Sequence, residues 1–440
     1  MSARDDGSRL SERPLPQPQE NLHRRLPRLV VDTTRRFQTH LGFGGAFTEA
    51  AATVWQSLPE AAREQFLRDC FDPAHGHGYT LGRVHINSCD FSLGNYAHAE
   101  RPGDFALESF SIERDRRALL PFIRAALRAA GRPIRLLASP WSPPAWMKTN
   151  ADMNHGGRLR AECRAAWAQC YVRFIREYER EGVPVWAVSV QNEPLAEQRW
   201  DSCLYSAEEE RDFVRDHLGP ALREAGLGHV KIVIWDHNRD LMVERAAVVF
   251  SDPKASSFVW GTGFHWYGPE CFDHVQQVHD AWPDKHLLFT EGCQEGGPHL
   301  GSWEVGERYA RNVIHDLNRW TVGWIDWNLL LDEQGGPNHV GNFCSAPILA
   351  DTRHGVLMHQ SAYWVLGHFA RFIRPGAGRV LAVAAQGIDA TAYANPDGST
   401  VVVATNPHDE GLRFALDVDG RCGAVELPPR SIATLVSSQR

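Results

Sequence analysis

Lysine is scarce in this chain of 440 residues. The only four are Lys148, Lys231, Lys254 and Lys285. Arginine supplies the remaining positive charge, and 54 acidic residues against 46 basic ones leave a formal net charge of −8. The clusters of basic residues that are typical of nucleic-acid-binding domains are missing. The composition therefore argues against a nucleic-acid partner.

Long hydrophobic runs are also missing. No stretch approaches the roughly 18 apolar residues of a membrane-spanning helix, so no membrane span is expected. The first residues, MSARDDGSRLSERPLPQPQE, are charged and rich in proline, and they lack the apolar centre of a secretory signal. We therefore expect a cytoplasmic protein, with residues 1–27 as a flexible N-terminal segment.

Motifs of several common enzyme classes do not occur. The nine cysteines form no CxxC pair and no Cys/His spacing of a zinc site, and their number is odd, which favours free thiols in a reducing compartment. The sequence has no P-loop, no GxSxG elbow and no HExxH motif, and GFGGAF lacks the spacing of a dinucleotide fingerprint. We expect neither a cofactor nor a metal.

What the chain does have is a regular alternation of short apolar runs and longer amphipathic stretches between residues 41 and 372. Amphipathic segments at 118–131 and 163–182 are typical of the helices in βα units. Eight such units match the length of an α/β fold of the (β/α)8 TIM-barrel type. The expected strands are 41–47, 81–87, 134–140, 185–191, 230–236, 259–267, 286–292 and 322–328.

The pattern changes after residue 372. Residues 373–440 alternate apolar with polar side chains and contain hairpin signals such as NPDGS, which predicts a small antiparallel β-sandwich domain. A strand at the start of residues 28–40, RLVVDTT, is expected to complete this sandwich, so that both ends of the chain belong to one domain.

Polar and aromatic side chains accumulate where the expected strands end. Turn residues and helix caps account for single cases, but they explain poorly why tryptophans and acidic residues recur together. The carboxyl ends of all strands in such a barrel meet at one face, so we interpret these residues as a functional rim. They are Glu49, Asp90, Trp141, Trp146, Asn192, Glu193, Asp236, His265, Trp266, Tyr267, Glu291, Trp327 and Asn328.

Two glutamates are prominent on this rim: Glu193 in VQNEP and Glu291 in LFTEGC. Hydrolysis of a glycosidic bond needs one carboxyl group to protonate the leaving oxygen and a second one to attack the anomeric carbon or to activate water. A nucleophilic carboxylate must stay ionised, and Arg83, His265 and Tyr267 are candidate partners for it. We expect the same three side chains to contact the substrate. The pair predicts a glycosidase, and the order of the two residues leaves their roles open.

Longer motifs carry a resemblance to a known family. FGGAFTEAAA, SCDFSLGNY, LLASPWSPPAWMKTN, QNEP, GFHWY and DWNLLLDEQGGPNHVGNF together resemble glycoside hydrolase family 30. The resemblance implies a TIM barrel with a β-sandwich, retention of anomeric configuration and no cofactor. It implies Glu193 as the general acid/base and Glu291 as the nucleophile, with His265 and Tyr267 beside the nucleophile. It further implies a sugar site made of Asp90, Trp146, Asn192, Trp327 and Asn342.

Three functions fit these motifs. The first is a β-glucosidase of the glucosylceramidase type, and the second is a β-1,6-glucanase that acts on a polymer, for which Trp200 and Trp303 offer further aromatic surface. The third is a carbohydrate-binding protein without catalysis. The expected partner is a β-glucoside in a glycolipid or a glucan, and the sequence leaves the oligomeric state open.

Overall fold

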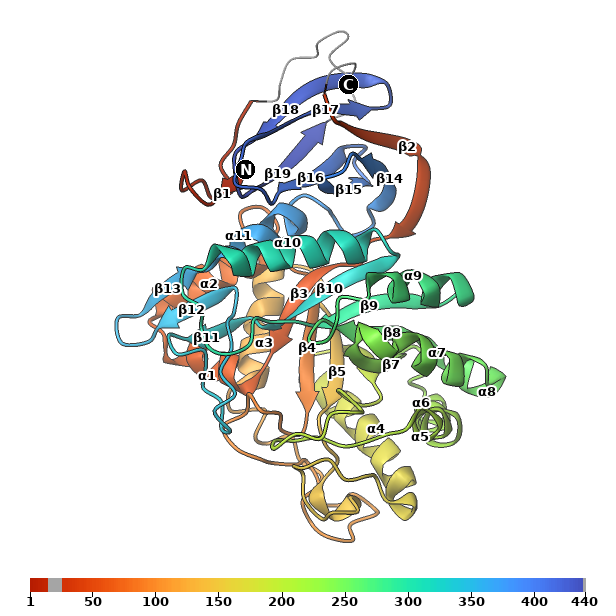
Figure 1. Ribbon diagram of the computed structural model, residues 1–440. Coiled ribbons are helices and arrows are strands. Elements are labelled where there is room, and N and C mark those ends of the chain that lie inside the picture. The colour runs from red at the N-terminus through yellow and green to blue at the C-terminus, as the bar shows by residue number, and fades with distance from the viewer. Residues whose placement is uncertain (15–25, 438–440) are drawn as a thin grey trace.

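The computed structural model describes residues 1–14 and 26–437. A barrel forms the lower part of the molecule in Figure 1, and a β-sandwich lies against one end of it. The chain starts in the sandwich, passes through the barrel and returns to the sandwich, as the colours of Figure 1 show. None of the helices in the described residues is long and apolar enough to cross a membrane.

Eight parallel strands close the barrel in the order β10-β3-β4-β5-β6-β7-β8-β9. The eight strands predicted from the apolar runs are confirmed, with differences only at their ends. Their inward side chains include Leu81, Leu137, Ala187, Val233, Leu288 and Ile325, which pack together inside the barrel. The strands are β3 (Gly42–Phe47), β4 (Leu81–Ile86), β5 (Arg135–Pro140), β6 (Val185–Ser189), β7 (Lys231–Asn238), β8 (Val259–His265), β9 (His286–Glu291) and β10 (Thr321–Asn328).

Helices surround the barrel. The two predicted amphipathic segments correspond to α3 (Leu119–Ala130), which ends at Gly131 with a φ of 58°, and to the short η3 (Ala161–Cys163) with α4 (Arg164–Arg180). The other helices are α1 (Glu49–Ser57), α2 (Glu60–Phe71), η2 (Ala145–Met147), α5 (Ala207–Phe213), η4 (Val214–Leu218), α6 (Gly219–Glu224), η5 (Arg239–Leu241), α7 (Met242–Phe250), α8 (Pro253–Ser256), α9 (Phe272–Ala281), α10 (Trp303–Leu317) and α11 (Ser361–Ala370).

The sandwich is built from one long sheet in the order β1-β19-β16-β15-β14-β2-β17-β18. The N-terminal strand β2 (Arg28–Thr39) pairs antiparallel with β14 and parallel with β17, so one pairing departs from the expected antiparallel pattern. The remaining strands are β1 (Ser2–Ala3), β14 (Gly378–Ala384), β15 (Asp389–Ala394), β16 (Thr400–Asn406), β17 (Leu412–Val418), β18 (Arg421–Leu427) and β19 (Ser431–Ser437).

The N-terminal segment differs in part from the flexible segment expected over residues 1–27. Ser2 and Ala3 form β1 and pair with Ile432 and Ser431 of β19, and the Ser2 hydroxyl lies 2.9 Å from Nε2 of His368. The exposed edge of β19 provides backbone partners that the composition of the segment did not reveal. Residues 15–25 of the expected segment lie outside the described residues.

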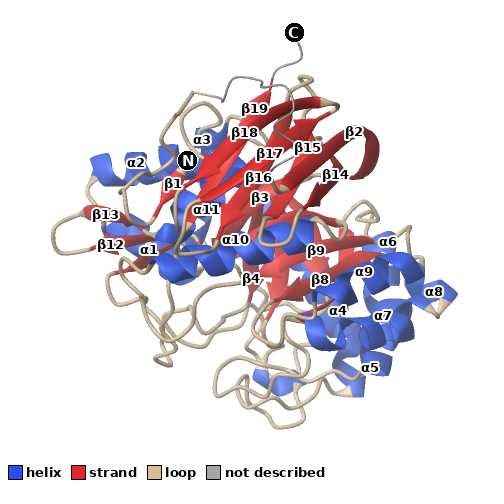
Figure 2. Ribbon diagram, turned by 45° about the horizontal axis from the view of Figure 1, so that its top comes forward, coloured by secondary structure: helices blue, strands red, loops and turns tan. Residues whose placement is uncertain are grey.

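A small sheet of three strands follows the last barrel strand and was not predicted. It consists of β11 (Leu330–Asp332), β12 (Ile348–Asp351) and β13 (Val356–His359). The carboxyl ends of β3 and β4 point away from the sandwich in Figure 1, and the long loops gather at that face in Figure 2. The loop between β11 and β12 therefore reaches the barrel mouth, where the expected functional rim lies.

Candidate active site

Glu193 and Glu291 come together at the barrel mouth. Oxygens of the two carboxylates and a ring nitrogen of His265 all lie within 4.8 Å of one another. The two glutamates line a pocket with a volume of about 230 Å³, which is a small pocket compared with the roughly 300–1,000 Å³ of sites for drug-sized ligands. The other lining residues are Asp90, Phe91, Trp141, Asn192, Gln198, Trp200, His237, Asn238, Tyr267, Cys293, Glu295, Trp327, Asn342 and Cys344.

The backbone turns the side chain of Glu193 into the mouth. Beyond the end of β6, the amide of Asn192 donates to the carbonyl of Pro140 at 2.8 Å, and the amide of Glu193 donates to the carbonyl of Asp236 at 3.0 Å. Glu193 has a φ of 46°, a left-handed conformation that costs about 1–3 kcal/mol in a residue with a side chain. Bonds to two neighbouring strands hold this conformation in place.

Glu291 receives two strong donors. Arg83 donates from Nη1 to Oε2 at 2.5 Å, and the Tyr267 hydroxyl donates to Oε1 at 2.9 Å. These contacts confirm two of the three partners proposed for an ionised nucleophile. Arg83 was also predicted to bind substrate, and here the structure corrects the prediction: Arg83 is completely buried beneath the two glutamates and does not line the pocket.

Asp236 is the counter-charge below the pocket. Its Oδ2 accepts from Arg83 at 2.7 Å and from Ser189 at 2.6 Å, while its Oδ1 accepts from Thr290 at 2.6 Å. Burial opposes its ionisation, but the Arg83 charge and a hydrogen bond to His265 outweigh burial and hold the pKa of Asp236 well below its usual range. The pairing of β7 with β8 shifts register next to Asp236, where this irregularity brings the carboxylate into the barrel.

His265 joins the carboxylates below the pocket. Its Nε2 lies 2.9 Å from Oδ1 of Asp236, and its Nδ1 lies 3.2 Å from Oε1 of Glu193. Burial lowers the pKa of His265, but the charge of Glu291 and the bonds to Asp236 and Glu193 outweigh burial and raise this pKa to about 9. The imidazole therefore hydrogen-bonds to Glu193 and also lies within 4.8 Å of the Glu291 carboxylate, beside the nucleophile where the resemblance placed it.

The two glutamates have different surroundings. Burial raises the pKa of Glu291 more than the charges of His265 and Arg83 lower it. Burial acts in the same direction on Glu193, but the charge of His237 and the bond from His265 outweigh burial and lower the pKa of Glu193 in the free protein. The pKa shifts of the free protein do not decide which glutamate is the acid, because a leaving group bound against Glu193 would bury this carboxyl further and raise its pKa. The hydrogen-bond donors to Glu291 distinguish the two glutamates better.

Asp90 and Asn342 form the polar side of the pocket. Asn342 donates to Oδ2 of Asp90 at 3.0 Å, and Asn338 donates to the same oxygen at 3.3 Å. Burial raises the pKa of Asp90 to about 7, against the effect of the Asn342 bond. Asn192 also lines the pocket, and its Oδ1 accepts from Arg83 at 2.9 Å. These side chains lie where the sequence placed the sugar site.

The aromatic wall is made by Trp327 and Trp141. The two rings stack with centroids 5.1 Å apart, and the guanidinium of Arg83 lies 4.8 Å from the Trp141 centroid. Trp146 was predicted at this place, and the structure corrects that prediction. Trp146, on the short helix η2, does not line the pocket; it packs half-buried against the main core, and its Nε1 donates to the carbonyl of Ala99 at 2.8 Å.

The sequence placed Trp141 on the functional rim but not in the sugar site, and it offered Trp200 only as further aromatic surface. It did not predict Gln198, His237, Asn238 and Glu295, which also line the pocket. Trp141 directly follows the last residue of β5, whereas Trp146 comes five residues later, so the distance from the strand end was the available signal. Gln198, Trp200 and Glu295 lie on loops, and nothing in the local sequence indicates which way a loop folds.

Glu193, His265 and Glu291 are the one group of three potential metal ligands found in the described residues. Arg83 lies 2.5 Å from Glu291, so a positive charge already neutralises this carboxylate. The donor set fits an acid/base pair better than a cation site, because a bound ion would be repelled by the buried guanidinium.

Comparison with known proteins places this site in a family. Residues 40–373 match the glycosyl hydrolase family 30 TIM-barrel domain, and residues 376–435 match the glycosyl hydrolase family 30 beta sandwich domain. The chain belongs to glycosyl hydrolase family 30. It is therefore a glycoside hydrolase, as the paired glutamates and the longer motifs predicted.

Its relatives within family 30 include enzymes of two kinds. The lysosomal acid glucosylceramidase of Mus musculus is 38% identical over 408 residues, which cover 88% of this chain and 79% of the mouse protein. The structure of SrfJ from Salmonella typhimurium has 40% sequence identity and a TM-score of 0.94, and covers 99% of this chain and 97% of SrfJ. The endo-beta1,6-glucanase BT3312 has 27% identity and a TM-score of 0.86, with 94% of each chain covered.

Proposed function

We propose that the protein is a retaining β-glycosidase that cleaves β-glucosidic bonds by double displacement. The observation that carries the proposal is the short separation of the two carboxylates, whose oxygens lie within 4.8 Å of each other. Inverting glycosidases keep their carboxyl groups about 6.5–9.5 Å apart to admit a water molecule, whereas retaining enzymes need only about 5–5.5 Å. The geometry supports direct attack by one glutamate.

In the first step, the carboxylate of Glu291 attacks the anomeric carbon, and the bond from this carbon to the aglycone oxygen breaks. Glu193 gives its proton to that oxygen, so that the aglycone leaves as an alcohol. In the second step, Glu193 takes a proton from water while the water oxygen attacks the anomeric carbon and releases Glu291. Two displacements at one carbon retain the β configuration.

The contacts favour this division of roles. Glu291 accepts hydrogen bonds from the Arg83 guanidinium and the Tyr267 hydroxyl, which stabilise the ionised form that a nucleophile requires. Glu193 contacts two imidazoles, with His265 Nδ1 at 3.2 Å and His237 Nε2 at 4.0 Å. No guanidinium donates to Glu193 among the described residues, and Glu193 lines the pocket, where a leaving oxygen or a water molecule can reach it.

For the substrate, we propose a β-glucoside bound as a single terminal sugar, as in a glucosylceramidase. The pocket of about 230 Å³ is lined by Asp90, Asn192, Asn342 and the stacked pair of tryptophans, and its size suits one sugar ring. Asp90 and Asn342 would hydrogen-bond the sugar hydroxyls, and Trp327 would cover an apolar face of the ring. The similarity to the mouse glucosylceramidase supports this choice.

A second candidate is a β-1,6-glucanase that acts on a polymer. Trp200 favours it, because this half-buried indole lines the pocket beside Gln198 and Glu295 and offers a platform for a second sugar. Trp303, the other tryptophan considered for this role, begins α10 and lies 4.9 Å from the Arg9 guanidinium in a cavity against the sandwich. It belongs to a different region of the molecule.

Product analysis by NMR on two substrates tests both candidates. The protein is incubated with glucosylceramide in detergent micelles and, separately, with a β-1,6-glucan. Release of β-glucose before its α-anomer from the lipid is the expected result. Release of oligosaccharides from the glucan, with the lipid intact, would identify the protein as a β-1,6-glucanase and would leave the proposed mechanism unchanged. A first product with the α configuration would contradict the retaining mechanism.

Two variants test the roles of the glutamates on an aryl β-glucoside with an acidic leaving group. Glu291→Gln should lose activity by about 10⁴-fold or more, because no covalent intermediate forms. Glu193→Gln should still release one equivalent of aryl alcohol rapidly, since this leaving group needs no proton, and should then hydrolyse the glycosyl-enzyme slowly. Glu270→Gln at the surface is the matched control. Full activity in Glu291→Gln would refute the assignment.

A further inference from the structure

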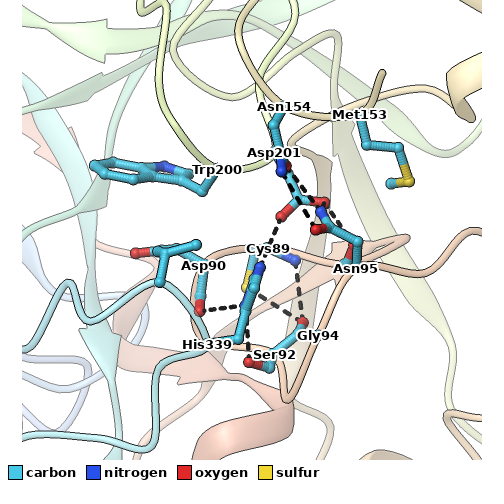
Figure 3. A network of polar contacts seen from close by, with 12 residues as sticks. Cys89, Asp90, Ser92, Gly94, Asn95, Met153, Asn154, Trp200, Asp201 and His339 are labelled. Atoms are coloured by element: carbon cyan, nitrogen blue, oxygen red, sulfur yellow. Dashed lines mark hydrogen bonds and ion pairs between the residues drawn. The ribbon is translucent and has the colours of Figure 1, made fainter. Parts of the chain in front are cut away.

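Four loops of the barrel mouth meet beside the sugar pocket at Asp201 and His339, which we call the loop clamp (Figure 3). Asp201 follows Trp200 in the loop after β6, and His339 lies between Asn338 and Asn342 in the loop after β11. The loop after β4 and the loop after β5 reach the clamp through Asn95 and Asn154, which are hydrogen-bonded to each other at 2.9 Å.

His339 holds the backbone that carries Asp90. Its Nδ1 lies 3.0 Å from the carbonyl oxygen of Asp90 and 3.0 Å from that of Ser92. Carbonyl oxygens only accept hydrogen bonds, so Nδ1 must carry a hydrogen and donate it. In a neutral imidazole the other nitrogen, Nε2, then has a lone pair and no hydrogen.

Asp201 faces that nitrogen. Its Oδ1 accepts hydrogen bonds from Ser88 at 2.5 Å and from Asn95 at 3.0 Å, and the residue is only 1% exposed. Its Oδ2 lies 3.9 Å from Nε2 of His339. Neither of these two buried atoms has a hydrogen-bond partner among the described residues. Without an added proton, two lone pairs would face each other in a site closed to solvent, which is costly.

We propose that one added proton turns Asp201 and His339 into an attractive pair, and that this pair closes the loop clamp and fixes Asp90 in the sugar pocket. With the proton present, the pair is attractive and joins the loops after β4, β6 and β11. Loss of the proton at alkaline pH leaves a carboxylate against a lone pair, so the loops separate and Asp90 loses its position. His339 is then a positioning residue, and the closed clamp sets sugar affinity. This inference rests on the proposed function only where sugar affinity is measured through the KM of the hydrolysis reaction.

Other titratable groups face the clamp. Asp90 and Cys89 belong to the loop after β4, and burial raises the pKa of Asp90 to about 7 and that of the Cys89 thiol well above its usual value. Lys148 lies on the side of the loop after β5, where Nζ donates to the carbonyls of Met153 and Ser202. Burial lowers the pKa of Lys148 to about 8, and burial raises that of Asp201. Because Asp90 and Lys148 titrate in a similar pH range, a variant is needed that changes the pair of Asp201 and His339 alone.

Asp201→Asn isolates it. The oxygen of the new amide still accepts hydrogen bonds from Ser88 and Asn95, and its N–H faces the lone pair of the neutral imidazole. The clamp therefore stays closed without the added proton. For the parent protein, KM on an aryl β-glucoside should rise about 10-fold above an alkaline inflection. Asp201→Asn should lose this inflection, whereas kcat should keep its own pH profile. His339→Phe should raise KM at every pH, and the remote His359→Asn should behave like the parent.

Hydrogen exchange gives a readout that needs no turnover. Peptides covering residues 88–95 and 338–342 should lose protection in the parent as pH rises through the same inflection, after correction for the intrinsic pH dependence of exchange. In Asp201→Asn their protection should be independent of pH. An unchanged KM inflection in Asp201→Asn, or protection in the parent that does not depend on pH, would overturn the proposal. Absence of glycosidase activity with the expected exchange pattern would overturn the proposed function alone.

Discussion

Arg83 connects the parts of the site at the scale of single residues. It lies on β4 and donates to Glu291 of β9, to Asp236 of β7 and to Asn192 beyond β6. A buried guanidinium needs anionic partners to offset its desolvation, and a nucleophilic carboxylate needs a cation to stay ionised. One side chain meets both requirements and fixes the distances between three pocket walls.

Removal of the tyrosine hydroxyl tests how far Glu291 depends on its second donor. Tyr267→Phe should lower kcat/KM by about 10- to 100-fold, because a hydrogen bond to a charged group contributes roughly 1.5–3 kcal/mol. The control is Tyr178→Phe, which removes a buried hydroxyl on α4 that donates to Asp115 at 2.8 Å, outside the pocket. The control should lose stability and keep its kcat/KM. Equal kinetic losses in both variants would contradict the assigned role of Tyr267.

The raised pKa of His265 predicts a change of stability with pH. The folded protein holds this proton up to a pKa of about 9, while the unfolded chain releases it near 6.5. The stabilisation is therefore complete below pH 6.5 and lost as pH rises towards 9, by on the order of 3 kcal/mol. Unfolding by denaturant at a series of pH values measures the slope. His265→Gln should flatten it, and His359→Asn should not; the same slope in His265→Gln would refute this account.

The sequence predicted the positions of some site residues correctly and those of others wrongly. Glu193 and Glu291 were found because each ends an apolar strand, and a barrel brings strand ends to one face. The family resemblance placed Trp146 in the sugar site, but a proline-rich turn and the bond to Ala99 direct it elsewhere. The contact of His339 with Asp201 joins two loops, and the conformation of such loops depends on tertiary packing that no local pattern encodes.

At the scale of elements, β3 and β4 leave no room for a side chain at Gly44. A Cβ atom on Gly44 would overlap the carbonyl of Leu81 on the neighbouring strand. Gly44→Ala should therefore destabilise the fold by about 3 kcal/mol or more, as overpacking against backbone does. Gly228→Ala is the matched control, because a Cβ there would meet nothing within 4 Å. Denaturant unfolding of both variants checks the prediction, and equal stabilities would contradict it.

The elements themselves were predictable to different degrees. The eight barrel strands are continuous apolar runs bounded by turns, which is the strongest pattern that a buried parallel strand leaves in a sequence. The strands β11, β12 and β13 have three or four residues each, too few to show a period. Strand β1 has two residues and depends entirely on the edge of β19, so it was invisible in a charged segment.

At the scale of the whole molecule, the barrel and the sandwich share a core. Tyr393, Val401, Val403 and Ile432 of the sandwich belong to the same buried cluster as the barrel helices. Polar contacts cross the boundary as well, since Gln38 donates to the carbonyl of Leu317 at 2.6 Å and Asn318 donates to that of Ala390 at 2.8 Å. The sandwich therefore supports the barrel at the end opposite the site.

A shared core predicts cooperative unfolding. Scanning calorimetry should show one transition, with a calorimetric enthalpy equal to the van't Hoff enthalpy, because neither part can lose its structure without exposing the apolar face of the other. Two resolved transitions would mean that the barrel and the sandwich are separate cooperative units. If a single transition is observed, a shorter chain that ends at residue 375 should also fail to give a soluble barrel, because it lacks the sandwich side of the shared core.

Double displacement requires that Glu291 form a covalent bond to the sugar while Glu193 transfers the proton. Its most direct test uses a β-glucosyl fluoride with fluorine also at carbon 2, which slows the second displacement and lets the glycosyl-enzyme accumulate. Peptide mass spectrometry then locates the sugar. The account predicts one equivalent of 2-fluoroglucosyl ester on Glu291 and loss of activity in parallel. A sugar attached to Glu193, or complete turnover without any labelled peptide, would contradict it.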